Sequence, residues 1–228
     1  PIRFTFSTTR EPVTVDAVLP SEFRYCHFLG SRPILLKAPA SIERPSHLFQ
    51  HCLFRNDVGM AIIRSPVRVL NSVVVARSNS YALAIELGSS NADEMPTIRH
   101  NAIRGNGIFL MLASGSADCG GEPFIQDNRI SESSAPAIMI SLGENSTISG
   151  LAISDCSLNS SSGIDVGYPY WGGAYVNLTV QRCDLTSVSC SLQGHSSLSG
   201  TFAFTNNYWG VTNSASIAAN VFGGALPS

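Results

Sequence analysis

The chain has 228 residues, of which 44% are hydrophobic and only 13% charged, and its formal net charge is −2. This nearly neutral balance, without a run of like charge, excludes the basic surface that nucleic-acid binding requires. No window of about 18 apolar residues occurs, so the sequence predicts no membrane span. Because Ser, Asn, Thr and Gly must cover most of the surface, the composition favours β-structure over amphipathic helices.

Residues 1–20 are predicted to form a short N-terminal cap, because Val13, Val15, Val18 and Leu19 can cover the first coil of a repeat region that begins at residue 21. From residue 21 to residue 210 one unit recurs, with the form apolar-x-x-turn residue-x-apolar. Asn71 lies in an imperfect copy, since Arg68 holds its first apolar position. Asn is also the turn residue at 98–103, 125–130 and 204–209, and Cys replaces it at 23–28, 49–54, 153–158 and 180–185.

The turn residues are predicted to stack as an internal ladder. They are Cys26, Cys52, Asn71, Asn101, Asn128, Cys156, Cys183 and Asn207, between 19 and 30 residues apart. Asn suits a sharp bend because it tolerates left-handed backbone angles and its amide can bond to the next coil. Cys fits the same place as a small buried residue. Cys26 with Cys52, and Cys156 with Cys183, would lie within reach of a disulfide, but reduced thiols are favoured because side chains stacked in parallel rarely meet the required torsion.

A unit of this length cannot bury its apolar positions alone, so consecutive units must stack with their strands about 4.8 Å apart. Period-2 apolar segments at residues 61–63, 83–85, 108–110, 138–140 and 164–166 predict a second strand in each coil. The sequence therefore predicts an all-β fold, a single right-handed parallel β-helix of about eight coils over residues 21–210. Residues 211–228 are predicted to form a short C-terminal cap.

The repeat, with its closing Asn206-Asn207-Tyr208-Trp209-Gly210, resembles the pectate-lyase-like superfamily of right-handed β-helix proteins. The resemblance covers roughly residues 20–210 and concerns the fold. It implies no single activity, because that superfamily contains lyases, glycosidases, epimerases, phage spikes and adhesins. The motifs Asn-Thr-Asp, Asp-Asp, Gly-His-Gly and Arg-Ile-Lys of its polygalacturonase-like members do not occur in this chain.

Long variable segments at residues 88–95, 113–122, 141–149 and 167–175 all follow the second strand of their coil, so they are predicted to project from one edge. Their aromatic and acidic residues are candidates for binding a sugar or a protein partner: Tyr168, Tyr170, Trp171, Tyr175, Asp93, Glu94, Asp118 and Glu122. The alternative is that the rings pack on neighbouring loops and cover the sheet. Cys119 is predicted to be the most exposed thiol, because it lies in one of these loops.

The residues before the turn residues are predicted to form an outward column: Tyr25, His51, Leu70, His100, Asp127, Asp155, Arg182 and Asn206. Asp127 and Asp155 would lie on adjacent coils, flanked by His100 and Arg182. Paired carboxylates can divide acid and base work, and an Arg can stabilise developing negative charge, so these four are the candidate catalytic residues. The alternative is an exposed ladder of opposite charges that only stabilises the fold.

The sequence favours a non-catalytic, extracellular or cell-surface β-helix protein that serves adhesion, glycan binding or structural assembly. Its expected partner is a polysaccharide or surface glycan, or a second copy in a filament, because weak caps leave strand edges open to end-to-end stacking. The alternative is a polysaccharide lyase or glycoside hydrolase that acts on the outward strand face. No cofactor or metal is expected, except calcium under the lyase alternative.

Overall fold

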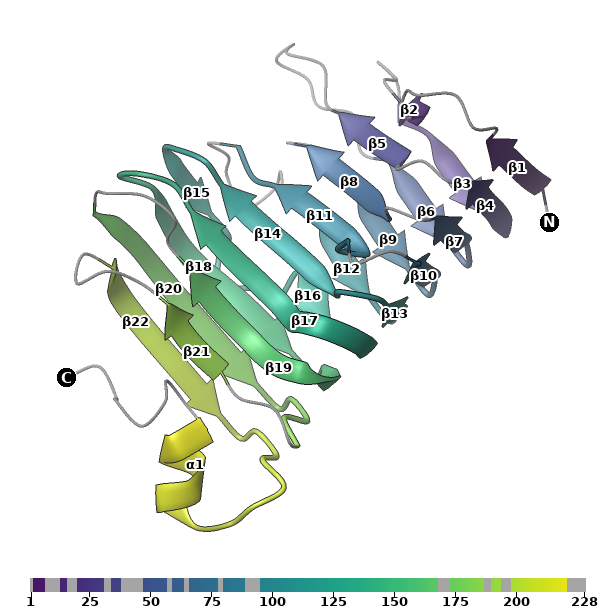
Figure 1. Ribbon diagram of the computed structural model, residues 1–228. Coiled ribbons are helices and arrows are strands. Elements are labelled where there is room, and N and C mark those ends of the chain that lie inside the picture. Colours follow the sequence, from purple (N-terminus) through teal and green to yellow (C-terminus); the bar gives the residue numbers. More distant parts are fainter. Residues whose placement is uncertain are drawn as a thin grey trace.

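In the computed structural model the chain winds as a parallel β-solenoid, which confirms the predicted fold class (Figure 1). The structure describes residues 2–6, 13–15, 20–30, 34–37, 47–56, 59–63, 66–77, 80–88, 95–167, 173–186, 190–193 and 198–220. The strand pairings among these residues are parallel, and each strand pairs with its equivalent one coil away. Residues that are a coil apart in sequence are therefore neighbours in space.

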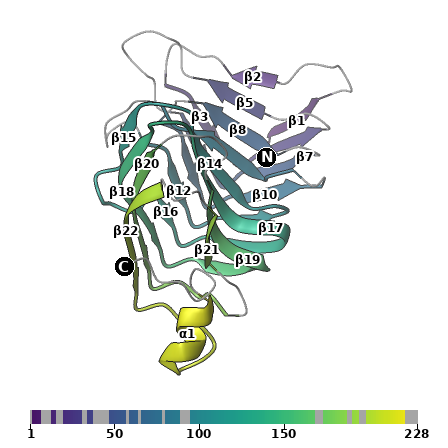
Figure 2. The ribbon, with the colours of Figure 1, turned by 60° about the vertical axis from the view of Figure 1, so that its left-hand side comes forward.

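Three stacks of strands form the faces of the solenoid (Figures 1 and 2). The first face contains β1 (Ile2–Phe6), β4 (Cys26–Gly30), β7 (Leu53–Asn56), β10 (Val73–Ala76), β13 (Ala102–Arg104) and the beginnings of β17 (Arg129–Leu142) and β19 (Ser157–Gly167). The second face contains β2 (Val13–Val15), β5 (Ile34–Lys37), β8 (Met60–Ile63), β11 (Leu83–Glu86), β14 (Ile108–Leu112), the ends of β17 and β19, and β21 (Cys190–Gln193).

The third face is a separate sheet. It contains β3 (Glu22–Arg24), β6 (Leu48–Gln50), β9 (Arg68–Leu70), β12 (Thr97–Arg99), β16 (Ile125–Gln126), β18 (Thr147–Ser154), β20 (Ala174–Gln181) and β22 (Leu198–Thr205), with β15 (Ser116–Asp118) paired to β18. A sharp bend joins each of these strands, except β15, to the first face. Eight bends with positive φ mark the successive coils among the described residues, and the number of full turns is smaller than the eight predicted.

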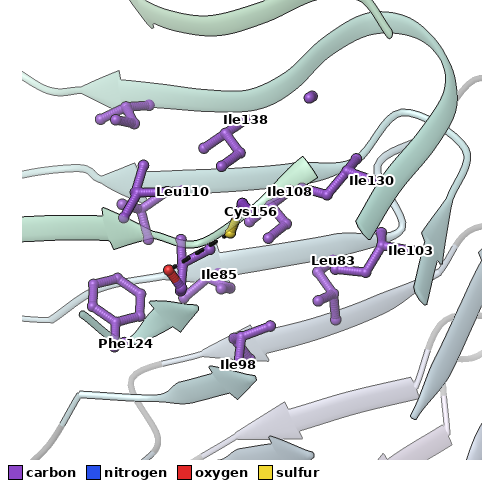
Figure 3. Close-up of a cluster of buried hydrophobic side chains, with 14 of the residues drawn as sticks. Leu83, Ile85, Ile98, Ile103, Ile108, Leu110, Phe124, Ile130, Ile138 and Cys156 are labelled. Carbon is purple, nitrogen blue, oxygen red and sulfur yellow. Dashed lines mark hydrogen bonds between the residues drawn. The ribbon is translucent and has the colours of Figure 1, made fainter. Parts of the chain in front are cut away.

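The core is a continuous column of apolar side chains, because every inward position stacks on its equivalent in the next coil. Figure 3 shows part of it, where Leu83, Ile108 and Ile138 of the second face lie in one register column. All three are fully buried. Burying one such side chain stabilises the fold by about 1.5–3 kcal/mol. Because a single unit cannot bury these side chains alone, this stabilisation offsets the entropy lost on ordering only when the units stack.

Aromatic rings continue the same stacking near the N-terminal end. Phe23 lies over Phe49 with ring centroids 4.8 Å apart, and Phe28 lies over Phe54 at 4.9 Å. Both distances match the spacing between strands, so each pair is a direct result of the parallel register.

The two ends of the solenoid differ. In the predicted N-terminal cap, β1 pairs with β4 and β2 pairs with β5, so these strands extend the solenoid itself. At the C-terminal end, α1 (Ser214–Asn220) lies beside the last coil (Figures 1 and 2). Ile217 of α1 packs against the apolar core. Within the described part of the chain, α1 is far too short to cross a bilayer and no other helix occurs.

Candidate functional site

One side chain per coil projects outward at the bend between the third and first faces. These residues, here called the bend ridge, are Tyr25, His51, Asn71, His100, Asp127, Asp155, Arg182 and Asn206. Each has φ between 48° and 58°, in the left-handed region that costs most side chains about 1–2 kcal/mol. From Tyr25 to Arg182, the N–H of each donates to a carbonyl oxygen of the next coil at 3.1 Å, which fixes the ridge in register.

Behind the ridge lies the internal ladder, and here one predicted residue is corrected. Val73 pairs with both Leu53 and Ala102, so the ladder position in this coil belongs to Ser72. The Ser72 hydroxyl accepts the N–H of Cys52, and its own N–H donates to Asn101 Oδ1 at 2.9 Å. Asn71 therefore belongs to the ridge and is exposed, and it takes the outward place predicted for Leu70.

The remaining predicted ladder residues lie in this internal stack. The Asn101 amide donates to Asn128 Oδ1 at 3.0 Å, and Asn207 Oδ1 accepts the N–H of Cys183 at 2.9 Å. Five cysteines, Cys26, Cys52, Cys119, Cys156 and Cys183, are buried free thiols. A hydrogen bond with Cys183 and burial raise the pKa of the Cys156 thiol. It is therefore protonated, and unreactive, at neutral pH.

Two of the four candidate catalytic residues form a tight ion pair. Arg182 Nε donates to Asp155 Oδ1 at 2.6 Å and Arg182 Nη2 donates to Oδ2 at 2.8 Å, while Gln126 Nε2 lies 3.3 Å from Oδ2. The hydrogen bonds from Arg182 lower the pKa of Asp155 to about 2. The carboxylate of Asp155 is thus ionised and occupied across the physiological pH range, which suits a structural partner better than an acid catalyst.

The other two candidate catalytic residues face each other one coil earlier. His100 Nδ1 lies 3.6 Å from Asp127 Oδ2, and both side chains are exposed. Asp127 and Asp155 thus lie on adjacent coils, as their spacing in the sequence implies. Each has its own basic partner, His100 for Asp127 and Arg182 for Asp155. At the N-terminal end of the ridge, the Tyr25 and His51 rings stack with centroids 5.0 Å apart.

A pocket of about 230 Å³ opens on the outer side of the third face, in the coil that precedes the bend at His100. Thr97 and Arg99 of β12 line it. Side chains alternate along a strand, so these two point outward while Ile98 between them is buried in the core. The rest of the lining comes from Met95 and Pro96 and from the segment 119–124. The ends of two of the predicted binding loops, 88–95 and 113–122, therefore meet at this pocket.

Main-chain hydrogen bonds to β18 hold the segment 119–124 over the sheet. The N–H of Cys119 donates to the Ser149 carbonyl at 2.8 Å, and the N–H of Gly121 donates to that of Gly150 at 3.0 Å. Gly150 has φ of 64°, and a Cβ on it would lie 2.6 Å from the Gly121 nitrogen, so only glycine permits this approach.

Asp118 and Glu122, two candidate binding residues, have different roles beside this pocket. Asp118 Oδ1 accepts the N–H of Gly120 at 3.0 Å and the Ser149 hydroxyl at 3.2 Å, so Asp118 shapes the loop. Glu122 is exposed and lines the pocket. Cys119 is only 3% exposed, and burial raises the pKa of its thiol to about 12, so its predicted exposure is wrong.

Arg99, which the sequence pattern does not single out, supplies the positive charge of the pocket. Its Nη2 donates to the Pro123 carbonyl at 2.8 Å. Its Nε is shielded from water and has no hydrogen-bond partner. Of five N–H donors, one is thus satisfied by the part of the chain that the structure describes.

The remaining candidate binding residues are separated from this pocket or lie outside the described ranges. Tyr175 is exposed on β20, in register with Thr147 of β18, which pairs in turn with Ser116 of β15. Tyr168, Tyr170, Trp171, Asp93 and Glu94 lie outside the described residues. In the part of the chain that the structure describes, no three His, Cys, Asp or Glu side chains lie close enough together to bind a metal ion.

In comparisons with known proteins, no family model, curated protein or solved structure matches this chain. The parallel β-solenoid is thus established by the strand register alone, and the function must be inferred from the ridge and the pocket.

Proposed function

We propose that this chain is a non-catalytic, extracellular or cell-surface β-helix protein that binds a glycan along its bend ridge. The observation that carries the proposal is the ridge itself, a straight row of outward side chains repeated once per coil. Stacked repeats characteristically present such extended surfaces to extended partners. A polysaccharide is the matching partner, because it too repeats along one axis.

The chemistry of the ridge supports a sugar ligand. The Tyr25 side chain is 59% exposed and stacked on His51, which together present an aromatic face at one end of the row. Aromatic rings with a polar edge suit the apolar faces and hydroxyls of sugar rings. Asn71 and Asn206 add amide donors and acceptors on the same row, and both are exposed.

The pairing of the ridge carboxylates favours binding over catalysis. A glycosidase or lyase needs a group that exchanges a proton near the working pH. Asp155 has a pKa of about 2 because Arg182 holds both of its oxygens. The pairs Asp155 with Arg182 and His100 with Asp127 are what a stable exposed ladder requires, which supports the structural interpretation of these four residues.

The extracellular or cell-surface setting and the membership of the pectate-lyase-like superfamily are part of the same proposal. The abundance of Ser, Asn, Thr and Gly in a chain with only 13% charged residues is compatible with such a setting. The resemblance in the ladder and the closing coil supports the superfamily at the level of the fold.

Binding of soluble pectins, alginates and glycosaminoglycans, measured by affinity electrophoresis, tests the proposal. We expect one class of polymer to bind, and the double substitution Tyr25→Ala with His51→Ala to weaken that binding about tenfold. Tyr208→Ala is the matched control, because Tyr208 is 65% exposed and lies off the ridge.

The same polymers also test the catalytic alternative. If the purified chain degrades any of them and Asp155→Asn abolishes the degradation, the protein is a lyase or hydrolase and the proposal is wrong. If none of the polymers is bound, glycan binding along the ridge is refuted.

A further inference from the structure

We infer that the pocket over Arg99 binds an anionic oxygen group, carboxylate or sulfate, carried by a single sugar unit. The inference rests on the proposed function for the identity of the ligand as a sugar. It adds the charge of the glycan and the site that binds the charged group. Three features of the pocket carry it: its size, the buried Arg99 Nε that has no hydrogen-bond partner, and its position beside the ridge.

The size of the pocket sets the size of the ligand. Its volume is about 230 Å³, whereas pockets that enclose a drug-sized molecule measure about 300–1,000 Å³. One sugar ring or one charged substituent fits, whereas an oligosaccharide does not. The pocket therefore recognises a substituent or a terminal unit of a longer chain.

The guanidinium of Arg99 determines the charge of the ligand. Its Nε is buried without a hydrogen-bond partner, and leaving a buried donor unsatisfied costs about 1–3 kcal/mol. Arg binds carboxylate and sulfate oxygens through two parallel N–H groups. Arg99 lines the pocket, so an oxygen group bound there would lie beside its guanidinium.

The walls of the pocket supply shape and further contacts. Met95, Pro96 and Phe124 give apolar surface for a sugar face, and Thr97 offers a hydroxyl. Cys119 also lines the pocket, but its protonated thiol adds no charge. Among the described residues of the lining, Glu122 is the only acidic one, and because it is exposed its repulsion on an anion is screened by water.

The position of the pocket links it to the ridge. Arg99 immediately precedes His100, and Phe124 lies three residues before Asp127, so the pocket belongs to the coils whose bends carry these two ridge residues. A polymer along the ridge can therefore place one charged unit in the pocket.

Two-dimensional ¹H–¹⁵N spectra of the arginine Nε–H groups provide the test. We expect glucuronate and galactose 6-sulfate to shift the Arg99 signal in a saturable manner, and glucose and galactose not to shift it. Acetate and inorganic sulfate separate the charged group from the sugar, and they are expected to bind at least tenfold more weakly, because they lack the ring that contacts the apolar wall.

Three substitutions test whether the charges that line the pocket control the binding of charged sugars. Arg99→Gln is expected to weaken binding of the charged sugars about tenfold to hundredfold, since it removes hydrogen bonds from a charged donor. Glu122→Gln is expected to tighten the same binding by about twofold, because it removes a like charge. Arg129→Gln, which removes the same charge from an exposed position on β17, is the matched control and should leave binding unchanged.

The outcomes separate this inference from the proposed function. If polymers bind through Tyr25 and His51 but Arg99→Gln has no effect, the pocket is not a site for an anionic group while the ridge proposal survives. If Glu122→Gln weakens binding and neutral sugars bind as tightly as charged ones, the pocket recognises sugar hydroxyl groups and the inference is wrong. Unfolding of Arg99→Gln would leave the Nε–H titration of the native protein as the deciding measurement.

Discussion

At the scale of single residues, the bend ridge combines side chains that suit its backbone with two that do not. Asn, Asp and His adopt φ near 55° more readily than other residues with a side chain, and they occupy six of the eight positions. Tyr25 and Arg182 occupy the other two, so the neighbouring coils must hold them in the left-handed conformation.

Replacing a strained ridge residue by Asn is therefore expected to stabilise the protein. Tyr25→Asn should raise the free energy of unfolding by up to about 1 kcal/mol, because Asn adopts the left-handed region at lower cost than Tyr. The converse substitution Asn206→Ala should lower it by about 1 kcal/mol. Urea unfolding followed by circular dichroism measures both, and equal midpoints for all three proteins would show that the bends carry no strain.

The same property of Asn explains why the ladder could be predicted from the sequence at every coil but one. Asn is favoured both at the left-handed bend and at the internal ladder position, and these positions are adjacent in the chain. In the coil with Asn71 the amide occupies the bend, while Ser72 supplies the ladder oxygen. Sequence alone cannot distinguish the two placements, because the pairing of Val73 with Leu53 and Ala102 decides between them.

At the scale of the elements, the ladder joins neighbouring strands through buried amides. Asn128 Oδ1 accepts both the N–H and the Nδ2 of Asn101, and Asn128 Nδ2 donates to the Ile98 carbonyl at 2.8 Å. Asn128→Ala would leave the Asn101 N–H buried and unsatisfied, and would remove one of the hydrogen bonds that the Ile98 carbonyl accepts. We expect a loss of about 2–4 kcal/mol in the free energy of unfolding. Asn159→Ala, the same change at an exposed position of β19, should alter stability by less than about 0.5 kcal/mol.

The ion pair between β18 and β20 should make stability depend on acid pH. Asp155 follows β18 and Arg182 follows β20, and their contact lowers the pKa of Asp155 from 3.8 to about 2. A lowered folded-state pKa contributes stability above about pH 4, and that contribution disappears as the pH falls toward 2. Asp155→Asn should thus lower the urea midpoint at pH 7 and change it little at about pH 2. A loss of equal size at both pH values would show that packing, rather than charge, is responsible; the effect is small because Arg182 is half exposed.

The pocket shows what periodicity cannot predict. The loops around 88–95 and 113–122 are predicted at one edge, since each follows the second strand of its coil. Their closure onto β12 depends on single contacts, such as Gly121 with Gly150 and Asp118 with Gly120 and Ser149, that leave no periodic pattern. For the same reason Arg99 resembles any outward residue in the sequence, and Cys119 looks exposed although the folded loop buries it.

At the scale of the whole molecule, the ends decide whether the solenoid stays single or stacks into filaments. β3 and β22 are the terminal strands of the third face among the described residues. Phe202 and Phe204 of β22 are only partly buried and pack on the core. Next to them Trp209 is 7% exposed, and Ile217 of α1 packs on the same cluster. This helix lies beside the last coil, at the end of the solenoid to which a second copy would have to bind (Figure 1).

Removal of residues 212–228 is therefore expected to cause self-association that the intact chain does not show. The truncation removes Ile217 from the apolar cluster around Trp209, beside β22, which is a terminal strand of the third face among the described residues. A sheet edge with apolar flanks pairs readily with another chain. Sedimentation velocity over a range of concentrations should give one species for the intact chain and growing oligomers for the truncated one. Ile217→Ser, which weakens only the packing of α1, should produce a smaller shift in the same direction, whereas Val211→Ser at an exposed site should produce none. A truncated chain that stays monomeric would mean that the last coil protects its own edge, and oligomers of the intact chain would support the filament that weak caps predict.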